Sequence, residues 1–194
     1  MIVQASASSK SEVVSAGVDL VLRRTGYSIL DSEGFRKGVI DSEKLKLRGR
    51  ERLAFIRDEL QRLVIAPKPD IVVVEGFSLM SENRPFDMGM VRCIIELLAH
   101  DANILIIDPK PKQLKYFVTA SGTASKKRMI ADVGKYYGVV TKDDNEADAV
   151  GLAKLGYVYL TGDSKRRCEL EIVRRLKNPK SKQQVRYKKE RIHV

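Results

Sequence analysis

The chain contains few cysteines and histidines and no long apolar run. Its 194 residues include two cysteines and two histidines, and Cys93, Cys168, His100 and His193 do not have the spacing of a zinc site. We expect free thiols in a reducing compartment. No run of about 18 apolar residues occurs, and the N-terminus lacks the apolar stretch of a signal peptide. We therefore expect an intracellular protein that does not span a membrane.

The positive charge is concentrated at the C-terminal end. Of the formal net charge of +11, residues 164–194 carry +9, from 12 Lys/Arg and 3 Asp/Glu, and residues 1–163 carry only +2. A basic, polar segment predicts a polyanionic partner, most simply nucleic acid; a solubilising tail is the alternative. The length suits one α/β core. We expect a disordered arm at 1–12, a folded domain at 13–163 and a basic tail at 164–194.

The apolar pattern predicts an α/β fold. From their apolar and β-branched runs, strands are expected at 13–21, 25–30, 36–40, 70–76 and 103–107. Helical spacing and capping residues predict helices at 48–65, 85–98, 125–137 and 144–160, and a short basic helix at 167–176. The first three strands are joined by short turns, and the fourth is apolar on both faces, as a central parallel strand is. This order predicts a five-stranded mixed sheet with helices on both faces.

The densest acidic stretch lies where a polar turn gives way to an apolar helix. Asp144 and Asp148 are four residues apart, and Asn145 and Asp148 are three apart, so these side chains share one helix face. Such a face repels itself unless a cation lies on it. The alternative is an acidic helix start that is favoured by the helix dipole and capped by Asp144 or Asn145.

Two more carboxylates are expected near this helix face. Asp19 ends or nearly ends the first strand and Glu75 ends the fourth, and sites in open α/β sheets form beyond the strand ends. Oxygen ligands without histidine or thiol select Mg²⁺ or Mn²⁺ over zinc. Two such ions, about 3.5 to 4 Å apart, would activate water and stabilise the leaving oxygen in phosphodiester cleavage. The acids predict a metal-dependent nuclease site without a small-molecule cofactor.

Several motifs, taken in order, resemble those of RuvC-type Holliday junction resolvases, particularly the phage-like branch of the RNase H-like nucleases. The motifs are GVDL at 17–20, TGY at 25–27, VVVE at 72–75, DPK at 108–110, KK at 126–127 and EADA at 146–149. The resemblance covers about residues 13–160. It implies an RNase H-like fold and a homodimer that nicks two opposed strands of a four-way DNA junction. It also implies two Mg²⁺ ions per site, with Mn²⁺ as a substitute, and a cytoplasmic location in a bacterial or phage-infected cell.

The resemblance implies metal ligands at Asp19, Glu75 and Asp148 and leaves the fourth ligand open. The family usually has Asp or His three residues before the last aspartate, where this sequence has Asn145. Asp144 stands one residue earlier. We favour Asp144, because negative charge governs affinity for divalent ions, and keep Asn145 as a neutral alternative.

Basic side chains and one aromatic are expected to contact DNA. Lys126, Lys127 and Arg128 crowd a helix N-terminus, where a bound anion would remove the conflict with the helix dipole; solvated side chains are the alternative. Phe77 follows Glu75 at a position where the family can place an aromatic against the branch. The expected DNA-binding set is Arg23, Arg24, Phe77, Lys110, Lys112, Lys126, Lys127, Arg128, Arg166 and Arg167.

The helix at 85–98 is apolar over so wide an arc that it must bury more than one side. We favour the sheet on one side and a partner subunit on the other; a helix enclosed by its own chain is the alternative. The predicted interface consists of Met88, Val91, Ile94, Ile95 and Leu98. A ribonuclease H, a broader branch or flap nuclease and a non-catalytic branched-DNA-binding protein remain alternative functions, although a ribonuclease H needs no second subunit.

Overall fold

The computed structural model describes residues 13–76 and 85–178, with the side chains of the second range from Met88 onward. The arm at 1–12, Phe77 and the end of the basic tail fall outside these residues. The strands are β1 (Ser15–Asp19), β2 (Arg24–Asp31), β3 (Gly34–Asp41), β4 (Ile71–Val74) and β5 (Leu105–Ile107). The helices are α1 (Gly49–Leu60), the π-helical turn η1 (Gln61–Ile65), α2 (Pro85–Asp101), α3 (Pro111–Thr119), α4 (Lys126–Tyr137), α5 (Asp144–Thr161) and α6 (Arg167–Lys177).

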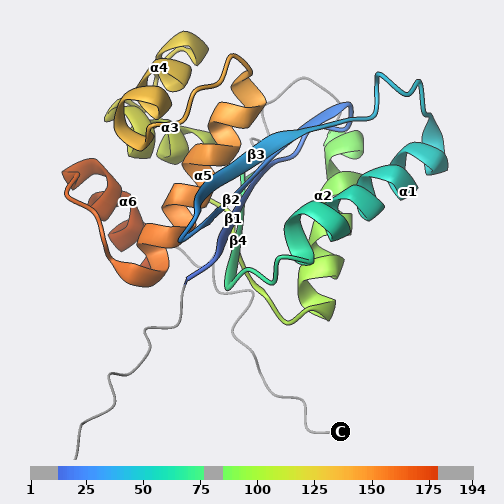
Figure 1. The fold of residues 1–194 in the computed structure, drawn as a ribbon, viewed down its shortest axis with the longest axis horizontal. Coiled ribbons are helices and arrows are strands. Elements are labelled where there is room, and N and C mark those ends of the chain that lie inside the picture. The colour runs from blue at the N-terminus through green and yellow to red at the C-terminus, as the bar shows by residue number, and fades with distance from the viewer. Residues whose placement is uncertain (1–12, 77–84, 179–194) are drawn as a thin grey trace, which may run out of the picture.

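The five strands form one mixed sheet in the order β3-β2-β1-β4-β5 (Figure 1). β1, β2 and β3 are antiparallel neighbours, while β4 runs parallel to β1 and to β5. The sheet therefore confirms the predicted meander followed by parallel strands. Since β1 and β4 are parallel, their carboxyl ends meet at one edge, with Val18 opposite Val74 in the last pair.

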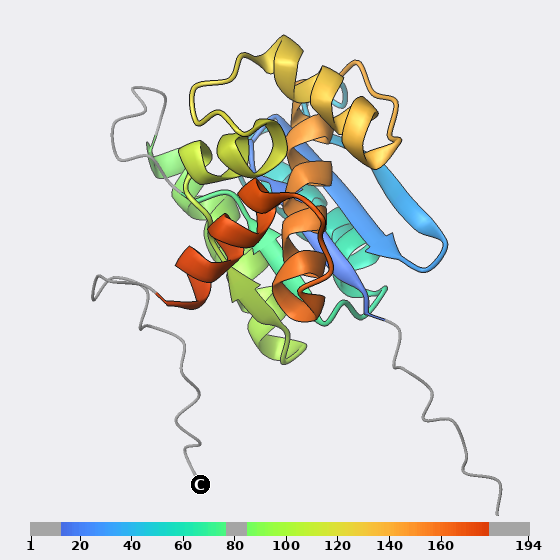
Figure 2. The same ribbon diagram turned by 90° about the vertical axis from the view of Figure 1, so that its left-hand side faces the viewer.

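Helices cover both faces of the sheet, as predicted. α1 and α2 lie on one face, and α3, α4, α5 and α6 lie on the other (Figures 1 and 2). β4 divides its side chains between the two cores: Val72 and Val74 join the core under α1 and α2, whereas Ile71 and Val73 join the core under α5. This alternation explains the continuous apolar run of β4, because both of its faces are buried.

Two glycines, one in β1 and one in β2, let α5 pack directly against these strands. A Cβ added to Gly17 of β1 would lie 2.2 Å from the Ala149 carbonyl oxygen, and one added to Gly26 of β2 would lie 2.2 Å from the Asn145 carbonyl oxygen. Any side chain at either position would push α5 away. The close approach brings the acidic first turns of α5 to the end of β1.

The apolar helix predicted at 85–98 forms α2, and its burial corrects part of the predicted dimer interface. Val91 and Ile95 are 0% exposed, because they pack into the chain's own core between the sheet and α1. They have no surface to offer to a partner. Met88, Ile94 and Leu98 are only partly buried, and Leu97 is 57% exposed. Among the described residues, no helix is long and apolar enough to cross a membrane.

Candidate active site

Two carboxylates lie at neighbouring strand ends. Asp19 is the last residue of β1 and is only 7% exposed. Glu75 follows β4 directly, and its backbone N–H donates to the Val18 carbonyl oxygen at 3.4 Å. The pairing of the two strands thus continues far enough to place the backbones of these two residues side by side.

The start of α5 brings two more carboxylates to this edge. Asp143 is the capping residue, and its side chain accepts hydrogen bonds from the N–H groups of Asn145 (2.9 Å) and Glu146 (3.2 Å). The cap is therefore neither Asp144 nor Asn145, the two residues named in the alternative interpretation of this stretch. Arg24 of β2 anchors Asp143 through an ion pair of 2.6 Å. With the helix start held in this way, Asp144 and Asp148 project from one face of α5.

The pKa values show that these acids share one electrostatic environment. Burial, followed by the charges of Glu75, Asp148 and Asp144, raises the pKa of Asp19 well above its ordinary value. Burial and then Asp148 raise the pKa of Glu75 to about 7. Burial and then Asp144 raise the pKa of Asp148 to about 6. Four carboxylates from two strands and one helix therefore repel one another at a single place.

Two lysines supply the positive charge nearest to these acids. Lys126, at the start of α4, pairs with Asp144; this bond lowers the pKa of Asp144 and raises that of Lys126. Lys115 of α3 lowers the pKa values of Glu75 and Asp148, although burial outweighs its effect. Lys115 is not among the residues predicted from the sequence. The one local signal for it is the Pro111 start of a helix, which places Lys115 about one turn inside α3.

Asp144 and Asn145 lie differently relative to the other acids. The Asn145 amide group donates to the Arg24 carbonyl oxygen at 2.9 Å and so ties α5 to β2. Asp144 instead contributes to the raised pKa values of both Asp19 and Asp148. The structure thus brings Asp144 to the acidic site and directs the Asn145 amide group away to the backbone of β2.

The site fits a hard divalent cation by its chemistry. The residues described contain no group of three or more His, Cys, Asp or Glu side chains gathered as they would be around a bound ion. The acids of the site nevertheless offer only carboxylate oxygens, and their mutual repulsion raises their pKa values. A divalent cation would compensate this repulsion better than a single lysine can.

The basic residues predicted to bind DNA have different surroundings. Arg23 and Arg24 are exposed but form ion pairs with Glu43 and Asp143, and Arg128 donates to the Thr119 carbonyl oxygen at 3.1 Å. The side chains that stay exposed on the surface of the described residues include Lys110, Lys112, Lys126, Lys127 and Arg167.

Arg166 requires a correction. Its guanidinium group donates to Glu169 (2.7 Å), to the Tyr137 hydroxyl (3.2 Å) and to the Val118 carbonyl oxygen (2.6 Å). It also lies 3.8 Å from the ring centroid of Tyr136. Because these partners occupy its donors inside the fold, Arg166 is an anchoring residue for α6 and not a DNA contact.

The sheet order, with acids at the ends of β1 and β4 and on the helix packed over them, defines an RNase H-like nuclease fold. A family model described as "Crossover junction endodeoxyribonuclease RuvC" matches residues 15–155. The chain belongs to this family.

Individual relatives agree with the family match. RuvC of Prochlorococcus marinus subsp. pastoris is 32% identical over 144 residues, which are 71% of this chain and 91% of that protein. RuvC of Anaeromyxobacter sp. is 30% identical over 146 residues, which are 73% of this chain and 71% of that protein. Thermus thermophilus RuvC has the same fold, with a TM-score of 0.66 at 20% identity over 77% of this chain and 97% of that one. The structure of T. thermophilus RuvC in complex with a Holliday junction substrate matches with a TM-score of 0.62 at 20% identity, over 73% of this chain and 90% of that one.

Proposed function

We propose that this chain is a divalent-metal-dependent endonuclease that resolves four-way DNA junctions as a homodimer. The observation that carries the proposal is the meeting of four mutually repelling carboxylates beside the ends of two parallel strands. Membership of the RuvC family supports it. T. thermophilus RuvC forms a complex with a Holliday junction substrate, and we extend this substrate to the present chain. Such an enzyme works where the DNA is, in the cytoplasm of a bacterial or phage-infected cell.

The acidic site would hold Mg²⁺, with Mn²⁺ as a substitute and two ions per site. The residues that would bind them are Asp19, Glu75, Asp144 and Asp148. When bound, such a pair of ions supplies an activated water and neutralises the leaving oxygen of phosphodiester hydrolysis. The chain's own contribution is rigidity: the backbones of Asp19 and Glu75 are held by strand pairing, and Asp148 lies on a capped helix. Pre-organised ligands of this kind reduce the cost of ordering the site.

Lys126 and Lys115 would bind the substrate's phosphate groups next to the acids. Lys126 pairs with Asp144 when no other cation is near. With a divalent cation held by the Asp144 carboxylate, the ammonium group of Lys126 would be free to hold a phosphate oxygen. Lys110, Lys112 and Lys127 are exposed on α3 or α4 or just before them, and can hold the DNA backbone on either side.

The homodimer would form through the outward side of α2. Leu97, with 57% of its surface exposed, is the prime candidate for the contact, and Ile94 and Leu98 flank it. Leu97→Glu should give a monomer of normal fold that nicks one strand at a time. Val91→Glu would unfold the chain instead, since Val91 is completely buried. A wild-type protein that sediments as a monomer at micromolar concentration without DNA would contradict paired cutting.

A substrate panel tests the proposed function. Labelled four-way junction, linear duplex, flap and RNA–DNA hybrid are each incubated with the protein and Mg²⁺. We expect symmetric nicks in the junction that a ligase can seal, and little cleavage of the other substrates. Asp148→Asn should abolish cleavage while it retains junction binding. Preferential cleavage of the hybrid would show a ribonuclease H, equal cleavage of flaps a general branch nuclease, and binding without cleavage a non-catalytic protein.

A further inference from the structure

α6, the last helix of the described residues, lies outside the residues that match the RuvC family. It packs across α3 and α5 (Figure 2). Its inner face consists of Cys168, Ile172, Val173 and Leu176, all buried. Together with the Arg166 anchor, these contacts make α6 an integral part of the fold, so its outer face has a fixed position relative to the active site.

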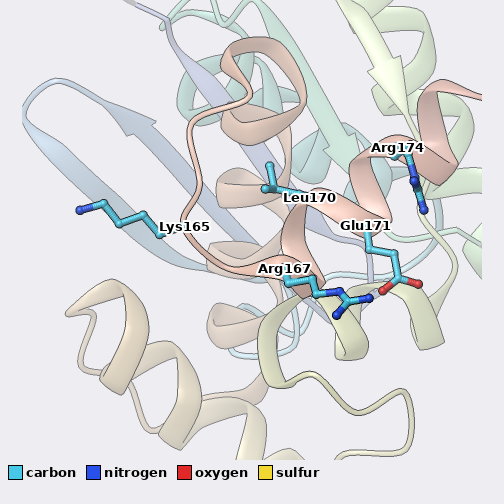
Figure 3. A pocket seen from close by; sticks show the side chains of 5 residues that line it. All are labelled: Lys165, Arg167, Leu170, Glu171 and Arg174. Carbon is cyan, nitrogen blue, oxygen red and sulfur yellow. The ribbon is translucent and has the colours of Figure 1, made fainter.

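The outer face of α6 forms a pocket of about 450 Å³ (Figure 3). Arg167, Leu170 and Arg174 follow one another at intervals of three and four residues, which places them along one stripe of the helix. Lys165 extends from the segment just before α6, as Figure 3 shows. No carboxylate of the active site lines this pocket; its lining residues are Lys165, Arg167, Leu170, Glu171 and Arg174.

The pocket is strongly cationic. Within the residues described, the side chains of Lys165, Arg167 and Arg174 form no ion pair, whereas Arg166 and Arg175 on the same helix are paired with acids. The one acid in the lining, Glu171, is engaged by Arg175 at 2.5 Å and by the Tyr116 hydroxyl at 3.1 Å.

We propose that this pocket binds the phosphate backbone of a junction arm, away from the strand that is cut. The inference rests on the proposed function and adds to it a second DNA contact. Arg167 and Arg174 are separated along the helix by about 10.5 Å, two turns, which spans about three base-pair steps of 3.4 Å. Leu170, 42% exposed between them, offers an apolar surface for a sugar face. An acidic protein segment is the competing occupant.

The position of α3 brings the pocket close enough to serve the same DNA molecule. α3 packs against α5, which carries Asp144 and Asp148, and also against α6. The hydroxyl of Tyr116 on α3 donates to Glu171 in the pocket lining at 3.1 Å. A helix with its side chains is about 10 to 12 Å across, or about three to four base-pair steps. A duplex arm longer than this can therefore contact both sites.

Salt-dependent binding tests the proposal. The variant is Arg167→Gln/Arg174→Gln in the full-length protein, and the control is Arg57→Gln/Arg62→Gln, which removes two exposed arginines of α1 and η1 on the opposite face of the sheet. Affinity for a junction with arms of about 20 base pairs is measured over a range of salt concentrations. Each lost phosphate contact should flatten the slope of log K against log salt by about 0.9. We expect a change of about 1.8 per subunit, or about 3.6 for the dimer, and at least about tenfold weaker binding at low salt.

A second measurement separates the pocket from the cleavage site. Cleavage of the long-armed junction at saturating concentration should proceed at the same rate in variant and wild type, because the pocket holds DNA away from the strand that is cut. A slope equal to that of wild type on long arms would overturn the proposal and leave the acidic protein segment as occupant. Absence of cleavage by wild type on every substrate, together with a flattened slope, would refute the proposed function and leave the pocket standing.

Discussion

Two regions of this molecule bury acids, and they treat them in opposite ways. Glu169 of α6 is 1% exposed and accepts hydrogen bonds from Arg166 (2.7 Å), the Tyr137 hydroxyl (2.9 Å) and the Ser164 hydroxyl (2.7 Å). Asp19 of β1 is 7% exposed. Within the residues described, its carboxylate has neither a hydrogen bond nor an ion pair, and the charges of Glu75, Asp148 and Asp144 outweigh that of Lys126 in raising its pKa.

The difference separates an acid that holds the fold together from acids that await a ligand. At Glu169 every contact is local to the packing of α6 on α3 and α4, and the charge is compensated inside the protein. At the active site, burial and repulsion raise the pKa values of Asp19, Glu75 and Asp148. Oxygen lone pairs left free in this way remain available to a cation from solution. The metal-free fold is less stable because of these acids, and a bound cation would compensate their charge.

Asp144 has features of both kinds of acid, and the largest expected effect is the loss of junction cleavage when it is replaced. Its ion pair with Lys126 resembles the structural pattern, but its charge acts on the active-site acids. If it is a metal ligand, Asp144→Asn should lower junction cleavage about 1,000-fold, or ~4 kcal/mol of activation free energy. Asn145→Ala should lower it by less than about tenfold, the cost of one hydrogen bond to Arg24. Single-turnover cleavage measures both; the reverse order would make Asn145 the ligand.

Breaking the structural pair should affect folding and not chemistry. Arg166→Met leaves Glu169 buried without its cation and should lower the free energy of unfolding by about 3 kcal/mol. Arg167→Met, the adjacent exposed arginine, should change it by less than about 0.5 kcal/mol. Urea unfolding followed by circular dichroism gives both values. Equal stability of the two variants would show that the Glu169 cluster does not anchor α6.

Removing an active-site acid should raise the free energy of unfolding, whereas removing Arg166 should lower it. Glu75→Gln eliminates a charge that the fold opposes, so the metal-free protein should gain about 2 kcal/mol of stability at pH 8. Saturating Mg²⁺ should then stabilise wild type and leave the variant nearly unchanged, since only wild type retains the full ligand set. Thermal unfolding with chelator and with Mg²⁺ checks this. A metal-free Glu75→Gln protein that is less stable than wild type would place Glu75 among the structural acids.

The difference between the structural acid Glu169 and the active-site acids is only partly predictable from the sequence. Asp19, Glu75 and Asp148 could be singled out because strand ends and helix spacing are local patterns, and the predicted five-stranded sheet is confirmed. Which way a side chain turns is not local. Arg166 and Arg167 have the same charge, yet one turns inward and the other outward, because Glu169 and Tyr137 meet only after α4 and α6 pack together. The apolar arc of α2 is visible in the sequence, but the sheet and α1 decide that Val91 is enclosed.

The smallest expected effect, at most about 1 kcal/mol per pH unit, is a pH dependence of the stability of the metal-free protein. It distinguishes the active-site acids from the structural acid Glu169. Asp148 has a pKa raised from 3.8 to about 6, and Glu75 one raised from 4.5 to about 7. Between the ordinary and the raised pKa of each group, the folded state binds more protons than the unfolded state, so the stability of the metal-free protein falls as pH rises. Asp148→Asn lacks this titrating group, so its stability should fall less than that of wild type as pH rises.

The test is a difference between two curves. Wild type and Asp148→Asn are unfolded with urea in chelator from about pH 3 to pH 8. Below about pH 3 the two should differ little, since Asp148 is then neutral in the folded and in the unfolded state. From about pH 4 to pH 6 the variant should gain on wild type by about 1 kcal/mol per pH unit at most, and above pH 7 the difference should be constant. A difference that shrinks with rising pH would mean that the ionised Asp148 stabilises the fold, as a structural acid does.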